Sequence, residues 1–304
     1  MLHGILNIYK EKGYTSHDVV AKLRGIVGQK KIGHTGTLDP DAEGVLPVCL
    51  GRATKVCDLL TEKDKTYRAV LLLGRTTDTQ DITGEILGET DTDFLKAEEV
   101  EKAVLGFVGE YSQIPPMYSA LKVNGRKLYE LAREGKNVER KARTVYIREI
   151  HILKIALPRV EMEVTCSKGT YIRTLCHDIG EKLGVGGCME SLLRTRVGSF
   201  CLENSRTLGE IQKAMEEGSL LQNLIPIDAV FGQYRRVQTE ARQEKLLYNG
   251  NTLCIKDERD VPADKELVRV YDSRGEFVAI YQYLAGLNQY RIVKMFFNGR
   301  KTEE

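Results

Sequence analysis

The chain has 304 residues, of which 42% are hydrophobic, so it can bury a sizeable core and form one large and one small domain. Its formal net charge is only +2, which does not by itself indicate a nucleic-acid-binding protein, and no segment approaches the roughly 18 apolar residues of a membrane span. Seven cysteines without a Cys-x-x-Cys pair and five histidines without metal-ligand spacing argue against a zinc site and favour reduced thiols in the cytoplasm.

The N-terminal part of the chain predicts a helix, a bent loop and a strand. Thr15 or Ser16 can cap a helix whose apolar residues follow a 3.6-residue period, and Gly28 can end it. The next stretch, KIGHTGTLDPDAEGVLPVCLG at residues 31–51, combines four glycines with two prolines, so its backbone bends for some purpose. Its last residues, 44–51, are typical of a buried strand.

Two later segments predict a strand and a strand-to-helix corner. KTYRAVLLLG at residues 65–74 has strong β character, with Tyr67 near its start. After an alternating strand at residues 159–167, the period becomes helical and ends at Gly184. This change places Tyr171 and Arg173 at the corner, where side chains often project into an active cleft.

Two neighbouring segments carry opposite charge. Residues 81–110 hold nine acids and two lysines, a net charge of −7, whereas residues 112–143 hold eight bases and three acids, a net charge of +5. The irregular composition of residues 115–143 predicts an excursion from the core. Its bases alternate with tyrosines, which suits a surface that meets phosphates and stacks on bases, although a solvated surface is the more ordinary explanation.

The C-terminal part predicts a small all-β module that begins near residues 227–236. Its short apolar segments are separated by turns and lie at residues 252–256, 267–272, 277–284 and 290–297. We find no internal repeat and no low-complexity segment.

Considered singly, the candidate functional residues have ordinary structural explanations. Asp39, held within GTLDP, is suited to act as nucleophile, base or metal ligand, but an aspartate before a proline most often forms a turn. Tyr67 is a good strand residue and needs no function. Arg173 begins an otherwise apolar helix and needs an acidic partner, which it would keep ionised. The remaining candidates are structural by default: His34, Tyr171 and Leu192.

Taken together, the segments resemble the conserved blocks of the bacterial TruB-type tRNA pseudouridine-55 synthases. The similarity covers residues 1 to about 228 and rests on GHTGTLDPDAEGVLPVCLGRATK, DKTYRAVLLLGRTTDTQD, IPPMYSALKVNGRKLYELAREG and CSKGTYIRTLCHDIGEKLG. The tail resembles the PUA-type RNA-binding β module of that family. The family often has Asp-Lys-Pro near its N-terminus, where this chain has YKEKG at residues 9–13, a difference that we expect to leave the cleft intact.

The resemblance implies an α+β fold with a central mixed, mostly antiparallel sheet flanked by helices. It implies a pseudouridine synthase domain at residues 1–228, with an RNA-binding insertion at 115–143, and a PUA-like domain at 229–304. The implied enzyme is a cytoplasmic monomer that isomerises uridine 55 in the T-loop of tRNA, without cofactor or metal. An additional tRNA-folding function is compatible with this expectation.

The resemblance also implies functions for individual residues. Asp39 would be the essential aspartate, Arg173 would keep it charged and oriented, and Tyr67 would stack on the flipped base and help to remove the C5 proton. A carboxylate can attack C1′ or C6, or take the C2′ proton, so the step remains open. His34 would fill the space left by the base, Tyr171 would support the pocket and Leu192 would pack on the uracil. The inserted segment would bind the T-loop through Lys122, Arg126 and Lys127.

Three other classes of function compete with this expectation. A non-catalytic RNA-binding or RNA-folding protein would lack Asp39 or Arg173, and both are present. A glycoside hydrolase or glycosylase would need two carboxylates around the sugar, and Asp81 and Asp178 are only weak candidates for the second. A metal-dependent nuclease would need clustered carboxylates, to which TDTQD at residues 77–81 is the nearest approach. We expect the acidic residues 81–110 to lie away from the RNA.

Overall fold

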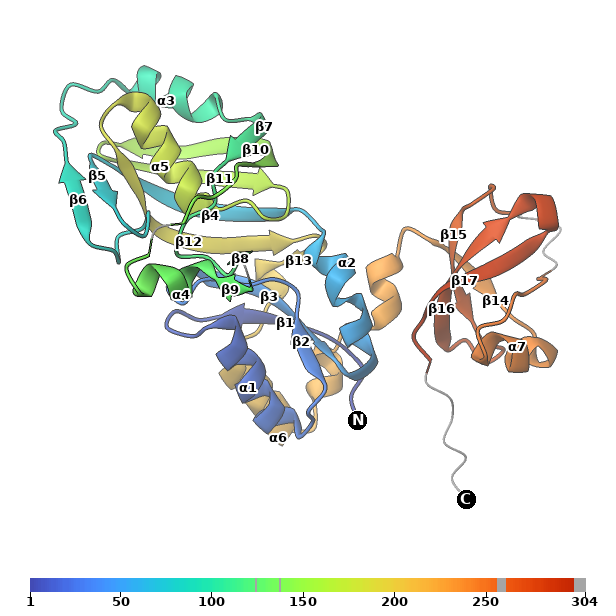
Figure 1. Cartoon of the computed structure of the whole chain (residues 1–304). Coiled ribbons are helices and arrows are strands. Elements are labelled where there is room, and N and C mark those ends of the chain that lie inside the picture. Colours follow the sequence, from blue (N-terminus) through green and yellow to red (C-terminus); the bar gives the residue numbers. More distant parts are fainter. Residues whose placement is uncertain (124, 137, 256–260, 298–304) are drawn as a thin grey trace.

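In the computed structural model, which describes residues 1–123, 125–136, 138–255 and 261–297, a large body carries a smaller four-stranded sheet to one side (Figure 1). The sequence predictions for 115–143 and 229–304 therefore each include a few positions outside the described residues. Within the described ranges, no helix is both long and apolar enough to cross a membrane.

A nine-stranded mixed sheet forms the large body. Its order is β1 (Gly4–Lys10), β3 (Glu43–Leu50), β12 (Gly187–Val197), β4 (Lys65–Leu73), β11 (Arg159–Cys166), β10 (Arg143–Ala156) and β7 (Gly109–Gln113), with β2 (Ile32–His34) beside β3 and β13 (Phe200–Cys201) beside β12. The β12–β3 pair is parallel, and the other neighbouring pairs are antiparallel. The predicted mixed, mostly antiparallel sheet is confirmed.

Helices cover the sheet at the places where the sequence changes to a helical period. Helix α1 (Ser16–Val27) begins after Thr15, whose hydroxyl accepts a hydrogen bond from the Asp18 amide at 3.0 Å, and it ends at Gly28 with a left-handed φ of 62°. The other helices are α2 (Cys57–Thr61), α3 (Ala97–Leu105), α4 (Leu128–Arg133), α5 (Ile172–Leu183), α6 (Leu208–Glu216) and α7 (Glu244–Tyr248). Short 3-10 turns occur at η1 (Gly51–Val56), η2 (Leu202–Asn204), η3 (Leu220–Asn223), η4 (Ile227–Phe231), η5 (Ala241–Gln243) and η6 (Ala285–Leu287).

Alternation along the strands determines which side chains reach which core. On β4, Tyr67, Ala69, Leu71 and Leu73 share one buried cluster with the apolar residues of α5, as the period-2 pattern predicts. Leu38, from the loop between β2 and β3, joins the same cluster. A second cluster packs α1 and α6 against β1 and β3. The loop that contains Asp39 and the start of α5 are therefore held against one shared core.

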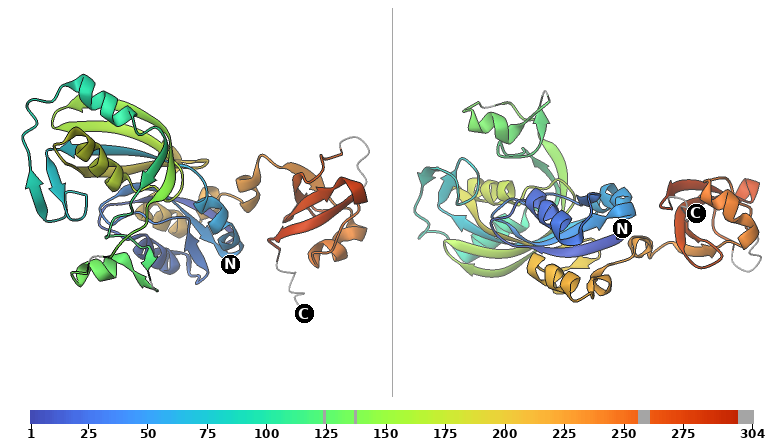
Figure 2. Two further views of the ribbon diagram at one scale, coloured as in Figure 1. Left: turned by 45° about the horizontal axis from the view of Figure 1, so that its top comes forward. Right: turned by 90° about the horizontal axis from the view of Figure 1, so that it is seen from below.

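The predicted excursion at residues 115–143 is present, but it contains regular structure. A short hairpin of β8 (Lys122–Val123) and β9 (Arg126–Lys127) precedes α4, and this green segment projects from the body of the sheet (Figure 2). A second hairpin, β5 (Arg75–Thr77) with β6 (Ile86–Glu89), lies earlier in the chain, after β4.

The C-terminal sheet has the order β14 (Arg235–Gln238), β15 (Leu267–Tyr271), β16 (Phe277–Leu284) and β17 (Gln289–Met295). The predicted strand at residues 252–256 was wrong in its described part, where Leu253 makes only an isolated bridge to Tyr290. The boundary predicted between residues 228 and 229 falls inside η4. Phe231 of that turn packs on Phe277 and Phe296, which connects the two parts of the molecule.

Candidate active site

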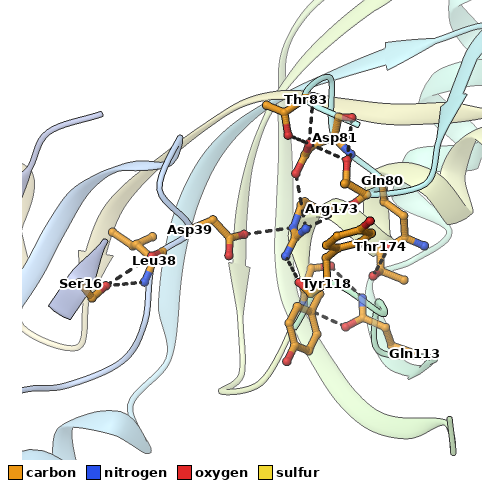
Figure 3. Close-up of polar contacts among 12 residues, drawn as sticks. Ser16, Leu38, Asp39, Gln80, Asp81, Thr83, Gln113, Tyr118, Arg173 and Thr174 are labelled. Carbon is orange, nitrogen blue, oxygen red and sulfur yellow. Dashed lines mark hydrogen bonds and ion pairs between the residues drawn. The ribbon is translucent and has the colours of Figure 1, made fainter. Parts of the chain in front are cut away.

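Asp39 lies in the loop between β2 and β3, and buried polar side chains hold the backbone on both sides of it. The Ser16 hydroxyl accepts a hydrogen bond from the Leu38 amide at 2.9 Å and donates to the Leu38 carbonyl at 3.4 Å (Figure 3). The Lys10 ammonium donates to the Pro40 carbonyl at 3.0 Å, and burial lowers the pKa of Lys10 to about 8. The loop is thus fixed from both the α1 side and the β1 side.

Arg173, the second residue of α5, faces Asp39 and uses all three of its nitrogens. Its Nε lies 3.0 Å from Asp39 Oδ2, and its Nη2 donates to the Tyr118 carbonyl at 2.9 Å (Figure 3). Its Nη1 donates to the Thr79 carbonyl at 3.1 Å and lies 3.4 Å from Asp81 Oδ2. Only 6% of the arginine side chain is exposed, so its orientation is fixed by these partners.

The Asp39 carboxylate is partnered by Arg173 yet remains accessible. Its side chain is 42% exposed on one side and enclosed by protein on the others. That enclosure raises the pKa of Asp39 above its ordinary value, the Arg173 charge opposes the rise, and the Asp81 charge adds to it. Among the described residues, no hydrogen bond joins this carboxylate to its own loop. Arg173 therefore limits the rise in pKa, and Asp39 is more than a turn former.

Asp81 is a site residue that sequence reasoning placed only among weak alternatives. Its Oδ1 accepts hydrogen bonds from the Thr83 amide at 3.0 Å and the Thr79 hydroxyl at 2.8 Å, while Oδ2 faces Arg173. It is the first acid of the −7 segment, so that segment does not lie wholly away from the candidate site. A guanidinium has more donors than one carboxylate can accept, and this surplus was the available signal.

Both predicted tyrosines lie on elements that adjoin the ion pair: Tyr67 shares a buried cluster with Leu38, and Tyr171 precedes the helix that carries Arg173. Tyr67, on β4, is only 9% exposed, and burial raises its pKa while Arg194 opposes the rise. Tyr171 precedes α5, where the Gln113 side chain bonds both its amide, at 2.8 Å, and its carbonyl, at 2.9 Å. Burial also raises the pKa of Tyr171, and the Asp39 charge adds a smaller rise for both phenols.

Leu192 and His34 occupy different surroundings. Leu192 stands opposite Ala69 across β12 and β4 and is partly buried against the cluster that contains Tyr67. His34 ends β2 and contacts His17 edge-on, with 5.3 Å between ring centroids. Together with the basic side chains of Arg24, Lys30 and Lys31, it lines a cleft of about 730 Å³ that is formed by α1, β2 and η1. Burial lowers the pKa of His34, which favours the neutral ring.

The predicted RNA-contacting bases lie on the β8–β9 hairpin, and some of their charge is already paired. Lys122 and Arg126 are exposed, and Arg126 forms an ion pair with Glu134 of the same segment. The Lys127 ammonium lies 3.2 Å from the Tyr129 hydroxyl. Lys122 is therefore more available to a phosphate than Arg126.

The acids of the TDTQD segment do not converge. The Asp78 carboxylate accepts hydrogen bonds from the Tyr118 hydroxyl at 3.1 Å and the Glu85 amide at 2.8 Å, whereas Asp81 faces Arg173. Over the described ranges, no three His, Cys, Asp or Glu side chains are arranged to hold a metal ion.

Sequence relatives were found over most of the chain. A chain named "tRNA pseudouridine synthase B" from Lachnoclostridium phytofermentans is 54% identical and aligns with 97% of this chain and 100% of its own length. A chain of the same name from Clostridium kluyveri is 46% identical, with the same coverage of both chains.

Solved structures give the same result. A chain in the structure of an H/ACA RNP bound to a substrate RNA containing 2′-deoxyuridine is 26% identical, with a TM-score of 0.72 over 97% of this chain and 86% of that chain. A chain of a Cbf5-Nop10-Gar1 complex is 27% identical, with a TM-score of 0.72 over 97% of this chain and 85% of that chain.

Two family models match consecutive parts of the chain. The model of the N-terminal domain of TruB family pseudouridylate synthases matches residues 24–172, and that of the tRNA pseudouridylate synthase B C-terminal domain matches residues 173–231. The first match contains Asp39, Tyr67 and Asp81, and the second begins at Arg173. With this sequence similarity over the whole length, the chain belongs to the TruB family of pseudouridylate synthases.

Proposed function

We propose that this pseudouridine synthase acts on uridine 55 in the T-loop of tRNA, as a cytoplasmic monomer, with Asp39 as the essential group and no cofactor. The observation that carries the proposal is the 3.0 Å contact between Arg173 Nε and the partly exposed Asp39 carboxylate. The curated relatives named tRNA pseudouridine synthase B support tRNA as the substrate. Seven free cysteines suit a reducing cytoplasm.

The reaction requires one carboxylate and a protected pocket. The N1–C1′ bond breaks, C1′ bonds to C5, the proton on C5 is lost and N1 gains a proton, so the reaction has no net redox change. Asp39 attacks C1′ or C6, or removes the C2′ proton, and the fixed arginine keeps it oriented. Tyr67 stacks on the flipped base and assists loss of the C5 proton, Tyr171 supports the pocket and Leu192 packs on the uracil.

The nearby acids favour this reaction over glycoside hydrolysis. A hydrolase needs a second carboxyl group free to act on the sugar or on water. The Asp81 side chain is only 16% exposed, and both of its oxygens have partners in Arg173, Thr79 and Thr83. Asp178 accepts a hydrogen bond from the buried Tyr111 hydroxyl. Neither acid is presented to a substrate as Asp39 is.

Access to a base inside the folded T-loop requires that the nucleotide flips out, at a cost of a few kcal/mol. The inserted segment, with Lys122, Arg126 and Lys127, supplies positive charge for the RNA backbone. His34 would fill the space that the flipped nucleotide leaves, and the basic side chains that line its cleft, Arg24, Lys30 and Lys31, support a position near RNA. The four-stranded C-terminal sheet extends the RNA-binding surface as a PUA-like domain.

The direct test is to incubate the protein with an unmodified tRNA transcript and map pseudouridine along the product. We expect modification at uridine 55, unchanged in the presence of a chelator, and a monomer by light scattering. Product only at a site outside the T-loop would contradict the assigned substrate position. A transcript with uridine 55 replaced by cytidine is the matched control and should remain unmodified.

A further inference from the structure

Arg194 is a fully buried arginine that the proposed chemistry does not yet use. It lies on β12, the strand between β3 and β4, where it pairs with Tyr67 across β4 and with Gly44 across β3. Its exposed fraction is 1%, and among the described residues it has no carboxylate partner. A buried guanidinium without an acidic partner is costly, so packing alone does not explain an arginine here.

The Arg194 guanidinium contacts both arms of the loop that presents Asp39. Its Nε donates to the Val45 carbonyl at 2.7 Å, on the arm that leaves the loop. Its Nη1 donates to the Thr37 carbonyl at 3.5 Å, on the arm that enters it. Thr37 and Val45 lie on opposite sides of Asp39 in sequence, so one side chain spans the base of the loop.

The backbone of Arg194 is equally close to this loop. Gly44 has a φ of +104°, and a Cβ built on it would lie 2.3 Å from the Arg194 carbonyl oxygen. A glycine is therefore required at this position, both for its backbone conformation and for the approach of β12. This close approach fixes the position of the Arg194 backbone relative to the loop.

The same guanidinium is directed to Tyr67. Residues that are paired across neighbouring strands project on the same side of the sheet, which places the two side chains together. Burial raises the pKa of Tyr67, and the Arg194 charge opposes that rise. The Nη2 atom is buried and has no hydrogen-bond partner within the described residues. Arg194 therefore lies between the loop of Asp39 and the phenol of Tyr67.

On the basis of the proposed function, we infer that Arg194 is a positioning residue that ties the Asp39 loop to the Tyr67 hydroxyl. The guanidinium fixes the separation of the carboxylate and the phenol, both of which must meet the same uracil. Arg194 does not touch the substrate, because its side chain is fully buried.

The first test is a double-mutant cycle that measures kcat for pseudouridine formation. Arg194→Lys should reduce kcat by at least about tenfold while the Kd for tRNA changes less than about threefold. In a Tyr67→Phe background, the same change should cost less than about threefold further, because the hydroxyl of the paired residue is gone. Losses that multiply would overturn the inference. Arg196→Lys, an exposed neighbour on the same strand, is the matched control and should keep kcat.

The second test does not require a substitution of the buried arginine. In Tyr67→Phe, amide hydrogens of residues 37–45 should exchange at least about fivefold faster than in the unmodified chain, while those of α1 stay unchanged. Tyr281→Phe, which removes a buried hydroxyl of the C-terminal sheet, should leave the loop unaffected. Unchanged exchange in Tyr67→Phe would overturn the coupling. Absence of uridine 55 modification by the unmodified chain would instead contradict the proposed function, since exchange needs no substrate.

Discussion

Arg173 Nε lies 3.0 Å from Asp39 Oδ2, and the two residues differ sharply in exposure, with 6% of the arginine and 42% of the aspartate side chain accessible. The charge that orients the acid is thus held within the protein, while the acid itself faces the surface. The same guanidinium also faces Asp81, so two carboxylates share one cation. This arrangement makes several properties of Asp39 measurable.

Asp39→Asn should abolish the reaction while the protein still binds tRNA. Loss of the carboxylate removes the only proposed nucleophile or base, so we expect at least about a thousandfold fall in the single-turnover rate. The Kd for tRNA should change less than about threefold, because the base is held by other groups. Filter binding and pseudouridine mapping provide the two readouts. A parallel loss of binding and activity would count against a chemical function for Asp39.

Activity should fall at acidic pH with a midpoint above the value of an ordinary aspartate, about 3.9. Burial raises the pKa of Asp39, and the reaction needs the ionised form, so activity is lost as the pH falls through this raised pKa. The pH dependence of kcat/KM on tRNA measures it. A midpoint at or below that of free aspartate would argue against the enclosed environment described for this acid.

Arg173→Lys should move this acidic midpoint to higher pH. Lysine keeps the charge but cannot reproduce three fixed nitrogen contacts, so it opposes the rise in the pKa of Asp39 less well. We also expect kcat to fall about 10- to 100-fold. Arg159→Lys, in an exposed ion pair with Glu190, is a suitable control for the type of substitution. An unshifted midpoint would show that the arginine does not tune Asp39.

Asp39→Asn should also raise the melting temperature at pH 7. A carboxylate whose pKa is raised by folding binds protons more tightly in the native state, so it contributes least to stability at pH values above its folded pKa. Asparagine resembles the protonated acid and avoids that cost. The advantage of the variant should shrink as the pH falls below the folded pKa, and calorimetry across pH measures this. A variant that is less stable at neutral pH would contradict the direction of the shift.

Lys122→Ala should weaken tRNA binding more than Arg126→Ala. Lys122 is exposed, whereas Arg126 is already paired with Glu134, so fewer counterions are released when Arg126 meets a phosphate. We expect about a threefold loss for Lys122→Ala at physiological salt and a salt dependence reduced by about one phosphate contact. Glu134→Gln should strengthen binding by freeing Arg126. Equal effects of the two alanine variants would argue that the ion pair does not persist in the complex.

Local patterns predicted the elements whose signals lie within a few residues. Thr15 and Gly28 bound α1 because capping is a short-range hydrogen-bond requirement, and the apolar face of β4 follows from alternation alone. The strand β14, by contrast, has the sequence RRVQ, with two exposed or half-exposed arginines and no alternating apolar run. It is stabilised by parallel pairing to β15, which local sequence does not specify.

The site could be predicted only for residues that lie in the motifs shared with the family. Arg173 alone indicated an unspecified acidic partner, and only the family resemblance implied that this partner is Asp39. Asp81 was named only as a weak candidate for a second carboxylate, because its contact with Arg173 depends on where the loop between β5 and β6 lies, which local sequence does not specify. The pairing of Arg126 with Glu134 depends on α4, the helix that lies between them in sequence. Because of this ion pair, the net charge of the segment overstates the positive charge available to RNA.

The hydrogen bond from Arg173 to the Tyr118 carbonyl has a mechanical consequence. Tyr118 lies at the root of the projecting segment that we propose meets the RNA, while Arg173 orients the acid that meets the base. One guanidinium therefore contacts both the segment proposed to bind RNA and the carboxylate proposed to react. If a poorly fitting RNA displaced the segment, the Tyr118 carbonyl would move, Arg173 would lose this hydrogen bond and the orientation of Asp39 would change. The fit of the RNA would then control the reaction through residues that already belong to the site.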